Sequence, residues 1–174
     1  FKDDKFDEKS FIKIIEWHIK QGTQGIVPCG TTGESPTLSH DEHKKVVELA
    51  VETSGGSLQV IAGTGSNSTK EAVSLTKHAK QCGADSALVV VPYYNKPSQE
   101  GLKKHFLKIA DTVDLPIFIY NIPGRSVVDM SNETIEKLSE HENIIGIKDA
   151  SNDLSRPAYL KKYITHKKFY QLSG

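Results

Sequence analysis

Cysteine is scarce in this sequence, in which Cys29 and Cys82 are the only two among 174 residues. They lie far apart and belong to no CxxC or Cys/His metal-binding pattern, so we interpret both as reduced packing thiols of a cytoplasmic protein. Long hydrophobic runs are also missing. The longest, such as residues 87–91, are far shorter than the roughly 18 residues that a membrane helix needs. The sequence therefore predicts no membrane span.

A net charge is also absent, because Lys plus Arg and Asp plus Glu both total 22. A neutral chain has no overall field to attract nucleic acid or an anionic membrane, so the balance favours small-molecule chemistry. Residues 63–65, Gly-Thr-Gly, lack the third glycine of GxGxxG, and no GxxxxGK[ST] motif occurs. No metal, nucleotide or flavin motif is present, so we expect no cofactor.

Short β-branched runs alternate with amphipathic stretches along the whole chain. The helix signals include two capping-box sequences, at residues 39–42 and 68–71, and an apolar stripe through residues 11–19 that Gly22 ends. The alternation predicts βαβ units and a parallel sheet that is covered on both faces. The predicted strands cover residues 25–27, 58–61, 88–91, 117–119, 144–147 and 169–172.

Two α/β architectures fit this alternation, a doubly wound sheet and a (β/α)8 TIM barrel. The missing phosphate-binding turn and the reactive residues at several strand ends favour the barrel. A barrel needs eight strands, whereas six are visible. We therefore expect residues 1–174 to form a partial TIM-barrel domain that lacks a first strand before Phe1 and at least one unit after Gly174. Such an open sheet would be unstable unless neighbours cover its edges.

The segment at residues 144–149, Ile-Ile-Gly-Ile-Lys-Asp, is the most informative. Alternation predicts that Ile144, Gly146 and Lys148 share one face, so that the lysine projects from the end of a buried strand. Desolvation there favours the neutral amine, which is a nucleophile for carbonyl groups. The alternative interpretation is a structural ion pair between Lys148 and Asp149.

Other predicted strands also end in residues with useful chemistry. Tyr120 can pass a proton, and Arg125 follows it with a guanidinium that suits a carboxylate. Thr31 and Thr32 stand in a glycine-flanked turn that could hold an anion. The structural alternative for Tyr120 is a core tyrosine, and that for Thr31 and Thr32 is a threonine-rich turn without a ligand. The adjacent rings of Tyr93 and Tyr94 must point in different directions.

Four segments together resemble the dihydrodipicolinate synthase family, within the superfamily of pyruvate aldolases and lyases that includes N-acetylneuraminate lyase. They are residues 30–35, 92–101, 120–125 and 146–149, which occur in the family's order and approximate spacing. The resemblance runs nearly end to end. It implies that Lys148 closes the sixth strand of a complete barrel and that the family's C-terminal helices are absent from this chain.

The resemblance implies a Schiff base between Lys148 and the ketone of pyruvate. Tyr120, Thr31 and Tyr94 would form the proton relay, with Tyr94 supplied by a partner subunit. This arrangement implies a homo-oligomer, a dimer of dimers.

The resemblance also implies how the substrates are held. Thr32 and the backbone at Gly33 would bind the pyruvate carboxylate, and Arg125 would bind that of L-aspartate-4-semialdehyde. Relatives that act on sialic acid lack this arginine and carry serine in place of Thr31. The alternatives are another pyruvate aldolase of the superfamily and a non-catalytic truncated barrel.

A regulatory site is a further hypothesis. In lysine-inhibited family members, a pocket at the dimer interface uses residues that align with six polar residues here, which predicts feedback by L-lysine. The alternative is that residues 40–43 are a solvated first turn of a helix. As a zinc site, these residues would lack further ligands. The six residues are Ser35, His40, His43, Asn67, Glu71 and Tyr93.

Overall fold

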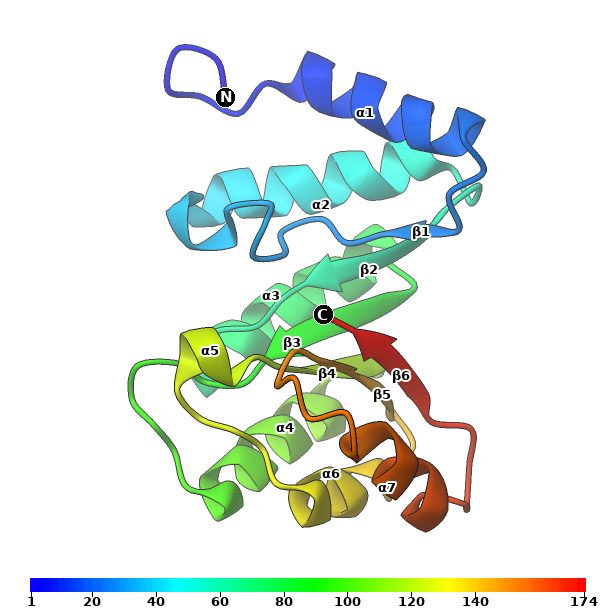
Figure 1. Cartoon of the computed structure of the whole chain (residues 1–174). Helices are drawn as coiled ribbons and strands as arrows, with labels where there is room; N and C mark the ends of the chain where they lie inside the picture. Colours follow the sequence, from blue (N-terminus) through cyan, green and yellow to red (C-terminus); the bar gives the residue numbers. More distant parts are fainter.

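The computed structural model describes residues 1–174 and contains one sheet of six parallel strands in the order β1-β2-β3-β4-β5-β6. Figure 1 shows the sheet curving from β1, beside α2, to β6, which carries the C-terminus. The order is that of the chain, so the sheet is an open half-barrel and β1 and β6 each have one neighbour. All six predicted strands are confirmed. Their bounds are Gly25–Ile26, Gln59–Gly63, Ser86–Val90, Ile117–Asn121, Ile144–Asp149 and Tyr170–Ser173.

Helices connect the strands. The capping box at Ser39 and Glu42 is confirmed, because each of these two residues bonds the backbone N–H of the other. The second predicted box forms only in part: Ser68 caps α3, but the Glu71 carboxylate turns to Ser66 and His40 instead. The helices are α1 (Glu8–Lys20), α2 (His40–Ser54), α3 (Thr69–Cys82), α4 (Gln99–Thr112), α5 (Pro123–Ser126), α6 (Asn132–Ser139) and α7 (Arg156–Tyr163), with a 3-10 turn η1 at Ser35–Thr37.

The sheet has two unlike faces. The helix-covered face belongs to a core cluster of 29 buried residues, which includes Val89, Ile119 and Ile147. The inner face carries a small cluster of Leu88, Phe118 and Tyr120. Burial of apolar area, at about 25 cal/mol per Å², therefore stabilises the fold mainly on the helix-covered face of the sheet. The inner face buries less apolar area and is available for a functional site.

One prediction about strand β5 is wrong. Gly146 and Lys148 pair with Phe118 and Tyr120, but the ladder between β4 and β5 shifts register just before Gly146. As a result, Ile144 packs into the helix-side core and does not share a face with Gly146 and Lys148. A β-bulge breaks simple alternation in this way. Alternation alone could not reveal it.

Gly146 lets the two neighbouring strands approach closely next to Lys148. A Cβ atom at this position would lie 2.5 Å from the main-chain oxygen of Tyr170 and 2.7 Å from the ring of Phe118. Both neighbours come from adjacent strands, so a larger residue would force the strands apart.

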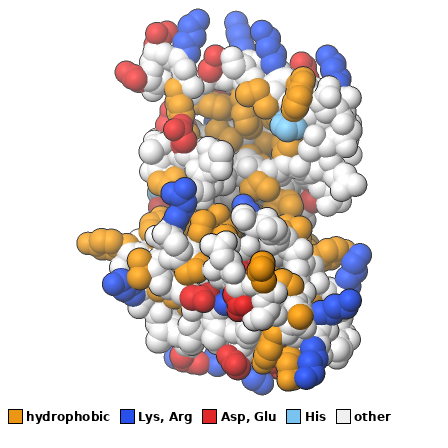
Figure 2. All heavy atoms as spheres, viewed as in Figure 1, with side chains coloured by type: hydrophobic (Ala, Val, Ile, Leu, Met, Phe, Trp, Pro, Cys, Tyr) orange, Lys and Arg blue, Asp and Glu red, His pale blue; other side chains and the backbone are white.

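Figure 2 shows hydrophobic side chains gathered in the hollow between α1 and the lower half of the molecule, while charged side chains of both signs stand along the upper and lower borders. Exposed apolar residues include Ile14 and Trp17 on α1, and Tyr170 and Leu172 on β6. None of the helices combines the length and apolar character that crossing a membrane requires.

Candidate active site

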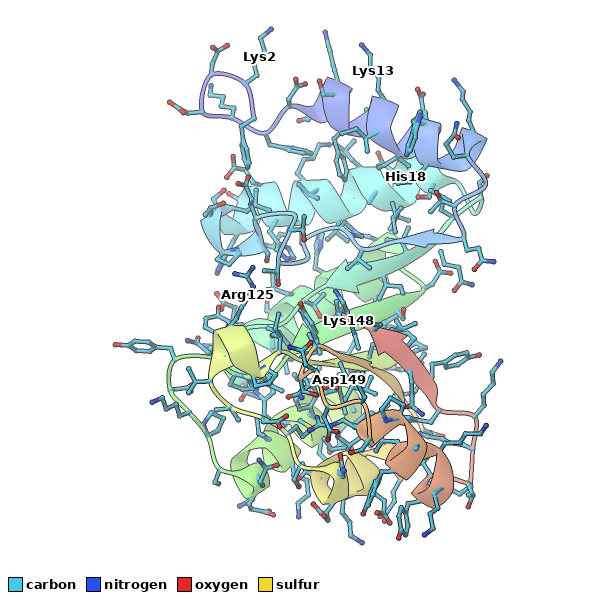
Figure 3. The ribbon with its side chains drawn as sticks, viewed as in Figure 1. Lys2, Lys13, His18, Arg125, Lys148 and Asp149 are labelled. Carbon is cyan, nitrogen blue, oxygen red and sulfur yellow. The ribbon has the colours of Figure 1, made fainter.

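The register of β4 and β5 brings two predicted site residues together. Tyr120 and Lys148 are paired positions, and the Lys148 Nζ lies 4.4 Å from the centre of the Tyr120 ring. Tyr120 is buried and Lys148 is half-buried. Figure 3 shows Lys148 near Arg125 in the middle of the molecule, well away from Lys2 and Lys13 on the α1 side. The amine is thus held against a phenol at the carboxyl ends of parallel strands.

No ion pair joins Lys148 and Asp149, which argues against the structural alternative for the lysine. The Asp149 carboxylate instead accepts hydrogen bonds from Asn121 (2.8 Å), Ser151 (2.6 Å) and Arg156 (3.2 Å). Neighbouring residues of a strand point to opposite faces, so Asp149 anchors the strand while Lys148 faces inward.

A polar network centred on the buried residues Asn121 and Arg156 holds the carboxyl ends of β4 and β5 together. The Asn121 amide donates to both Asp129 (2.7 Å) and Asp149, and its oxygen accepts from the backbone N–H of Met130 (3.0 Å). Arg156, which is 4% exposed, donates to Asp129 from Nη2 and to Asp149 from Nη1. The network joins the ends of β4 and β5 to the segment before α6 and to the start of α7. Sequence reasoning missed it, because its members are distant in sequence and form no motif.

A cavity of about 420 Å³ opens beside these strands. Its lining includes Thr31, Tyr120 and Arg125, so three predicted site residues surround one space. Lys148 is not among the lining residues, and it lies beside the cavity with its Nζ 4.4 Å from the centre of the Tyr120 ring. The cavity is large enough for a small keto acid and a second substrate, since ligand sites commonly measure about 300–1,000 Å³.

The threonine turn follows β1 and is exposed, and Thr32 and Gly33 stand outside the cavity lining. The turn is closed by hydrogen bonds from the N–H of Glu34 to Thr31 O (3.1 Å) and from that of Ser35 to Gly30 O (3.4 Å). The N–H groups of Thr32 and Gly33 make no hydrogen bond within the chain. Free, adjacent N–H groups in a turn suit a carboxylate.

The two adjacent tyrosines have different surroundings, as predicted. Tyr93 lines the cavity, and its main-chain oxygen accepts a bond from the Asn67 amide (3.3 Å). Tyr94 is 90% exposed and its backbone has a φ of 73°. A left-handed backbone is uncommon for a residue other than glycine, and here it turns the Tyr94 ring outward. The structure therefore keeps Tyr94 apart from Tyr120 and Thr31 within this chain.

Most of the residues predicted to bind L-lysine line the same cavity. The Nε2 of His40 lies 2.6 Å from the Oε1 of Glu71, and the Nε2 of His43 lies 2.8 Å from the carbonyl oxygen of Gly63. Burial lowers the pKa of His43, so its neutral form is favoured. The residues on this wall are Ser35, His40, His43, Glu71 and Tyr93, whereas Asn67 stands just outside the lining.

A curved parallel sheet with helices outside it and reactive side chains at the strand ends defines the class of (β/α)8 barrels. The family model for the dihydrodipicolinate synthetase family matches residues 1–174. The chain belongs to that family, and the predicted partial barrel is confirmed.

Individual relatives agree with this assignment. The 4-hydroxy-tetrahydrodipicolinate synthase of Rhodospirillum centenum is 59% identical over 174 residues, which are all of this chain and 60% of that protein. The dihydrodipicolinate synthase of Acinetobacter baumannii, solved in complex with pyruvate, is 50% identical with a TM-score of 0.93, over 98% of this chain and 59% of that one. The dihydrodipicolinate synthase of Cyanidioschyzon merolae, solved with lysine bound, is 40% identical with a TM-score of 0.96. The match covers 100% of this chain and 60% of that one. The chain spans 58% to 60% of the length of three curated relatives that it matches.

The polar network generates a stability prediction. Replacing Arg156 by Met leaves the carboxylates of the half-exposed Asp129 and the mostly buried Asp149 without their cation, which should cost about 2 kcal/mol. As a control, Lys80→Met breaks an exposed pair with Asp114 and should cost less than about 1 kcal/mol. Urea unfolding of the full-length protein measures both. Equal costs for the two variants would show that the network does not hold the strand ends.

Proposed function

We propose that the protein containing this chain condenses pyruvate with L-aspartate-4-semialdehyde to form 4-hydroxy-tetrahydrodipicolinate, the committed step of lysine and diaminopimelate biosynthesis. It would be a lyase of the class I aldolase type. The observation that carries the proposal is the Lys148 amine against the Tyr120 ring, beside a cavity that Thr31 and Arg125 also line. Similarity along the whole chain to synthases, one of them solved with pyruvate, supports the same reaction.

The chemistry begins at the amine. Lys148 attacks the ketone carbon of pyruvate, water leaves, and an imine forms. Loss of a proton from the methyl group gives an enamine, whose carbon attacks the aldehyde of the second substrate. The amino group of that substrate then adds to the imine carbon and displaces Lys148, which closes the ring and frees the amine. In this proposal the Tyr120 hydroxyl passes protons to and from the reacting atoms, which the closeness of the Tyr120 ring to the amine supports. Thr32 and Gly33 offer unpaired N–H groups to the pyruvate carboxylate.

Arg125 decides the aldehyde in this proposal. It is exposed at the cavity, where its guanidinium can bind the carboxylate of L-aspartate-4-semialdehyde. Another pyruvate aldolase of the superfamily is the second candidate. Comparing turnover of aspartate semialdehyde with that of N-acetylneuraminate and sugar-derived 2-keto acids separates the two.

A second subunit completes the proposal. Tyr94 is exposed and turned outward, which suits a residue that enters the site of a partner. We propose a homotetramer, a dimer of dimers, in which each Tyr94 joins the relay of Tyr120 and Thr31 across a subunit boundary. Both cysteines are free thiols, which fits the cytoplasm as the place of action.

Borohydride trapping tests the covalent step. Incubation of the full-length protein with pyruvate and borohydride should reduce the imine and fix its carbon skeleton to Lys148. Mass spectrometry of the digested protein then finds the adduct on the peptide that contains Lys148. No adduct on that lysine would leave a non-catalytic, truncated barrel as the better interpretation.

Matched variants sharpen this test. Lys148→Arg keeps the charge but should abolish trapping, whereas Lys168→Arg, whose ammonium lies over the Tyr170 ring, should trap normally. Tyr94→Phe should still trap pyruvate while turnover falls by about 10²-fold or more. Mixing Tyr94→Phe with Lys148→Arg subunits should restore part of the activity, because a hybrid dimer contains one intact site.

We further propose that L-lysine inhibits the enzyme by binding the polar wall of the cavity. Glu71 and the neutral His43 offer a carboxylate and an acceptor to the ammonium groups of lysine. The related Cyanidioschyzon merolae enzyme, which was solved with lysine bound, supports this assignment.

Turnover measured under millimolar L-lysine tests the regulatory site. Inhibition should appear in the wild-type protein and weaken by at least about tenfold in Glu71→Gln, because the variant lacks the charge that pairs with an ammonium. D-lysine serves as the control ligand. Unchanged turnover of the wild-type protein would exclude this regulation while leaving the proposed reaction intact.

A further inference from the structure

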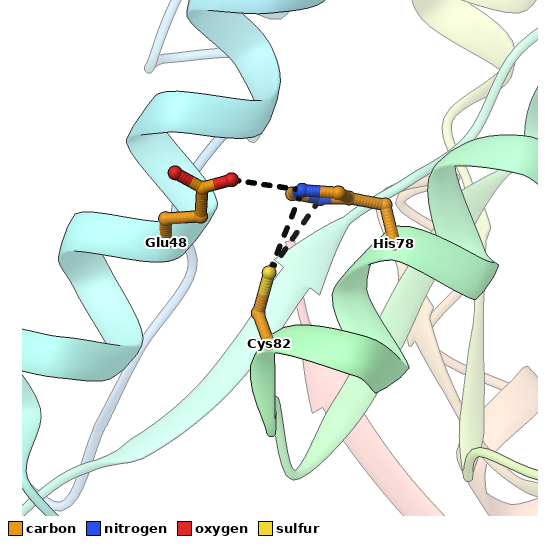
Figure 4. A group of neighbouring side chains, drawn as sticks. All are labelled: Glu48, His78 and Cys82. Carbon is orange, nitrogen blue, oxygen red and sulfur yellow. Dashed lines mark hydrogen bonds and ion pairs between the residues drawn. The ribbon is translucent and has the colours of Figure 1, made fainter.

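A group of three potential metal ligands lies between α2 and α3. It consists of Glu48 on α2 with His78 and Cys82 on α3 (Figure 4). One ligand atom from each residue lies within 4.8 Å of the other two. His78 and Cys82 are four residues apart, so they share one face of α3. One histidine four residues before a cysteine forms no metal-binding pattern in the sequence, and the fold adds the Glu48 carboxylate to this pair.

The distances fit a tetrahedral zinc site. Bonds of about 2.0 Å to nitrogen and oxygen and about 2.3 Å to sulfur place the ligand atoms roughly 3.3–3.6 Å apart around one ion. His78 Nε2 lies 3.1 Å from the Glu48 Oε1 and 3.6 Å from the Cys82 Sγ. Two of the three separations are thus close to the tetrahedral values, and the third, between Glu48 and Cys82, is within 4.8 Å.

One side-chain adjustment is needed. The Cys82 Sγ lies 3.7 Å from Nδ1 and 3.6 Å from Nε2, so it faces the ring of His78 more than either nitrogen. The last torsion of His78 has a broad preference, so the ring is free to turn its Nε2 toward the sulfur and the carboxylate when an ion binds.

The local charge favours a cation. Glu52 follows Glu48 by one turn of α2, so two carboxylates lie near the Cys82 thiol. A divalent ion would balance their charge and stabilise the thiolate. The nearby Lys80 is paired with Asp114.

Cys29 differs from Cys82 in its burial and in its neighbours. It is buried, and its only hydrogen-bond partner is the backbone oxygen of His43, so it has no carboxylate or imidazole nitrogen beside it. Cys29 is the packing thiol that the sequence predicts, whereas Cys82 is half-buried and has metal-binding neighbours.

We propose that Glu48, His78 and Cys82 bind a divalent transition ion of the zinc type, with water as the fourth ligand. The side chains of Glu48 and His78 are 40% and 18% exposed, so ion and water can enter from solvent. Sulfur and imidazole ligands select zinc or cobalt over magnesium or calcium. The site lies on the helices outside the sheet and ties α2 to α3, so it needs none of the residues of the proposed reaction.

Cobalt titration of the untagged, full-length protein under reducing conditions tests the site. Co²⁺ bound to a thiolate absorbs strongly in the near ultraviolet, and its visible bands report tetrahedral geometry. One equivalent of Co²⁺ should give both the thiolate absorption and the visible bands. Added Zn²⁺ should abolish these signals by displacing the cobalt, whereas Mg²⁺ should leave them unchanged. Cys82→Ser should lose the thiolate absorption, while Cys29→Ala should keep it.

A second measurement keeps the test independent of folding defects in one variant. Glu48→Gln retains the thiolate, so it should show the absorption but bind cobalt at least about tenfold more weakly. Zn²⁺ should raise the melting temperature of the wild-type protein more than that of Glu48→Gln, since a ligand of the folded state stabilises it. Absence of the absorption in the wild-type protein, or its persistence in Cys82→Ser, would overturn the proposal.

Discussion

The pairing of β4 with β5 is the constraint on which the site depends. It sets Tyr120 opposite Lys148 and Asn121 opposite Asp149, so one step along the ladder separates the reactive pair from the anchoring pair. The anchoring pair is locked by Asp129 and Arg156 on the far side of the strands. A slip of one residue would exchange the two faces and send the amine into the helix-side core. The polar network therefore stabilises the register as well as the fold.

The same cavity serves two sets of residues in this account. Tyr120 and Arg125 belong to the proposed reaction, whereas His43 and Glu71 belong to the proposed lysine site. His43 bonds the carbonyl oxygen of Gly63 at the end of β2, so a movement of His43 on lysine binding would also move this strand end. Because both proposed sites line one cavity, coupling between them needs only a short path of contacts.

Sequence patterns predicted what is local. Apolar runs located all six strands, and polar residues after those runs located Thr31, Tyr120 and Arg125 at one cavity. Features that depend on pairing between distant segments were not predictable in the same way. The register shift in β5 reversed the face of Ile144, and the contacts of Arg156 with two aspartates have no local pattern.

The proposed reaction requires the Lys148 amine to bond the ketone carbon of pyruvate. A crystal structure of the full-length protein with pyruvate examines this bond. Continuous density should run from the Lys148 Nζ to the second carbon of pyruvate, with the carboxylate at the turn of Thr32 and Gly33. Pyruvate bound without a bond to this nitrogen, or joined to another lysine, would contradict the proposed reaction.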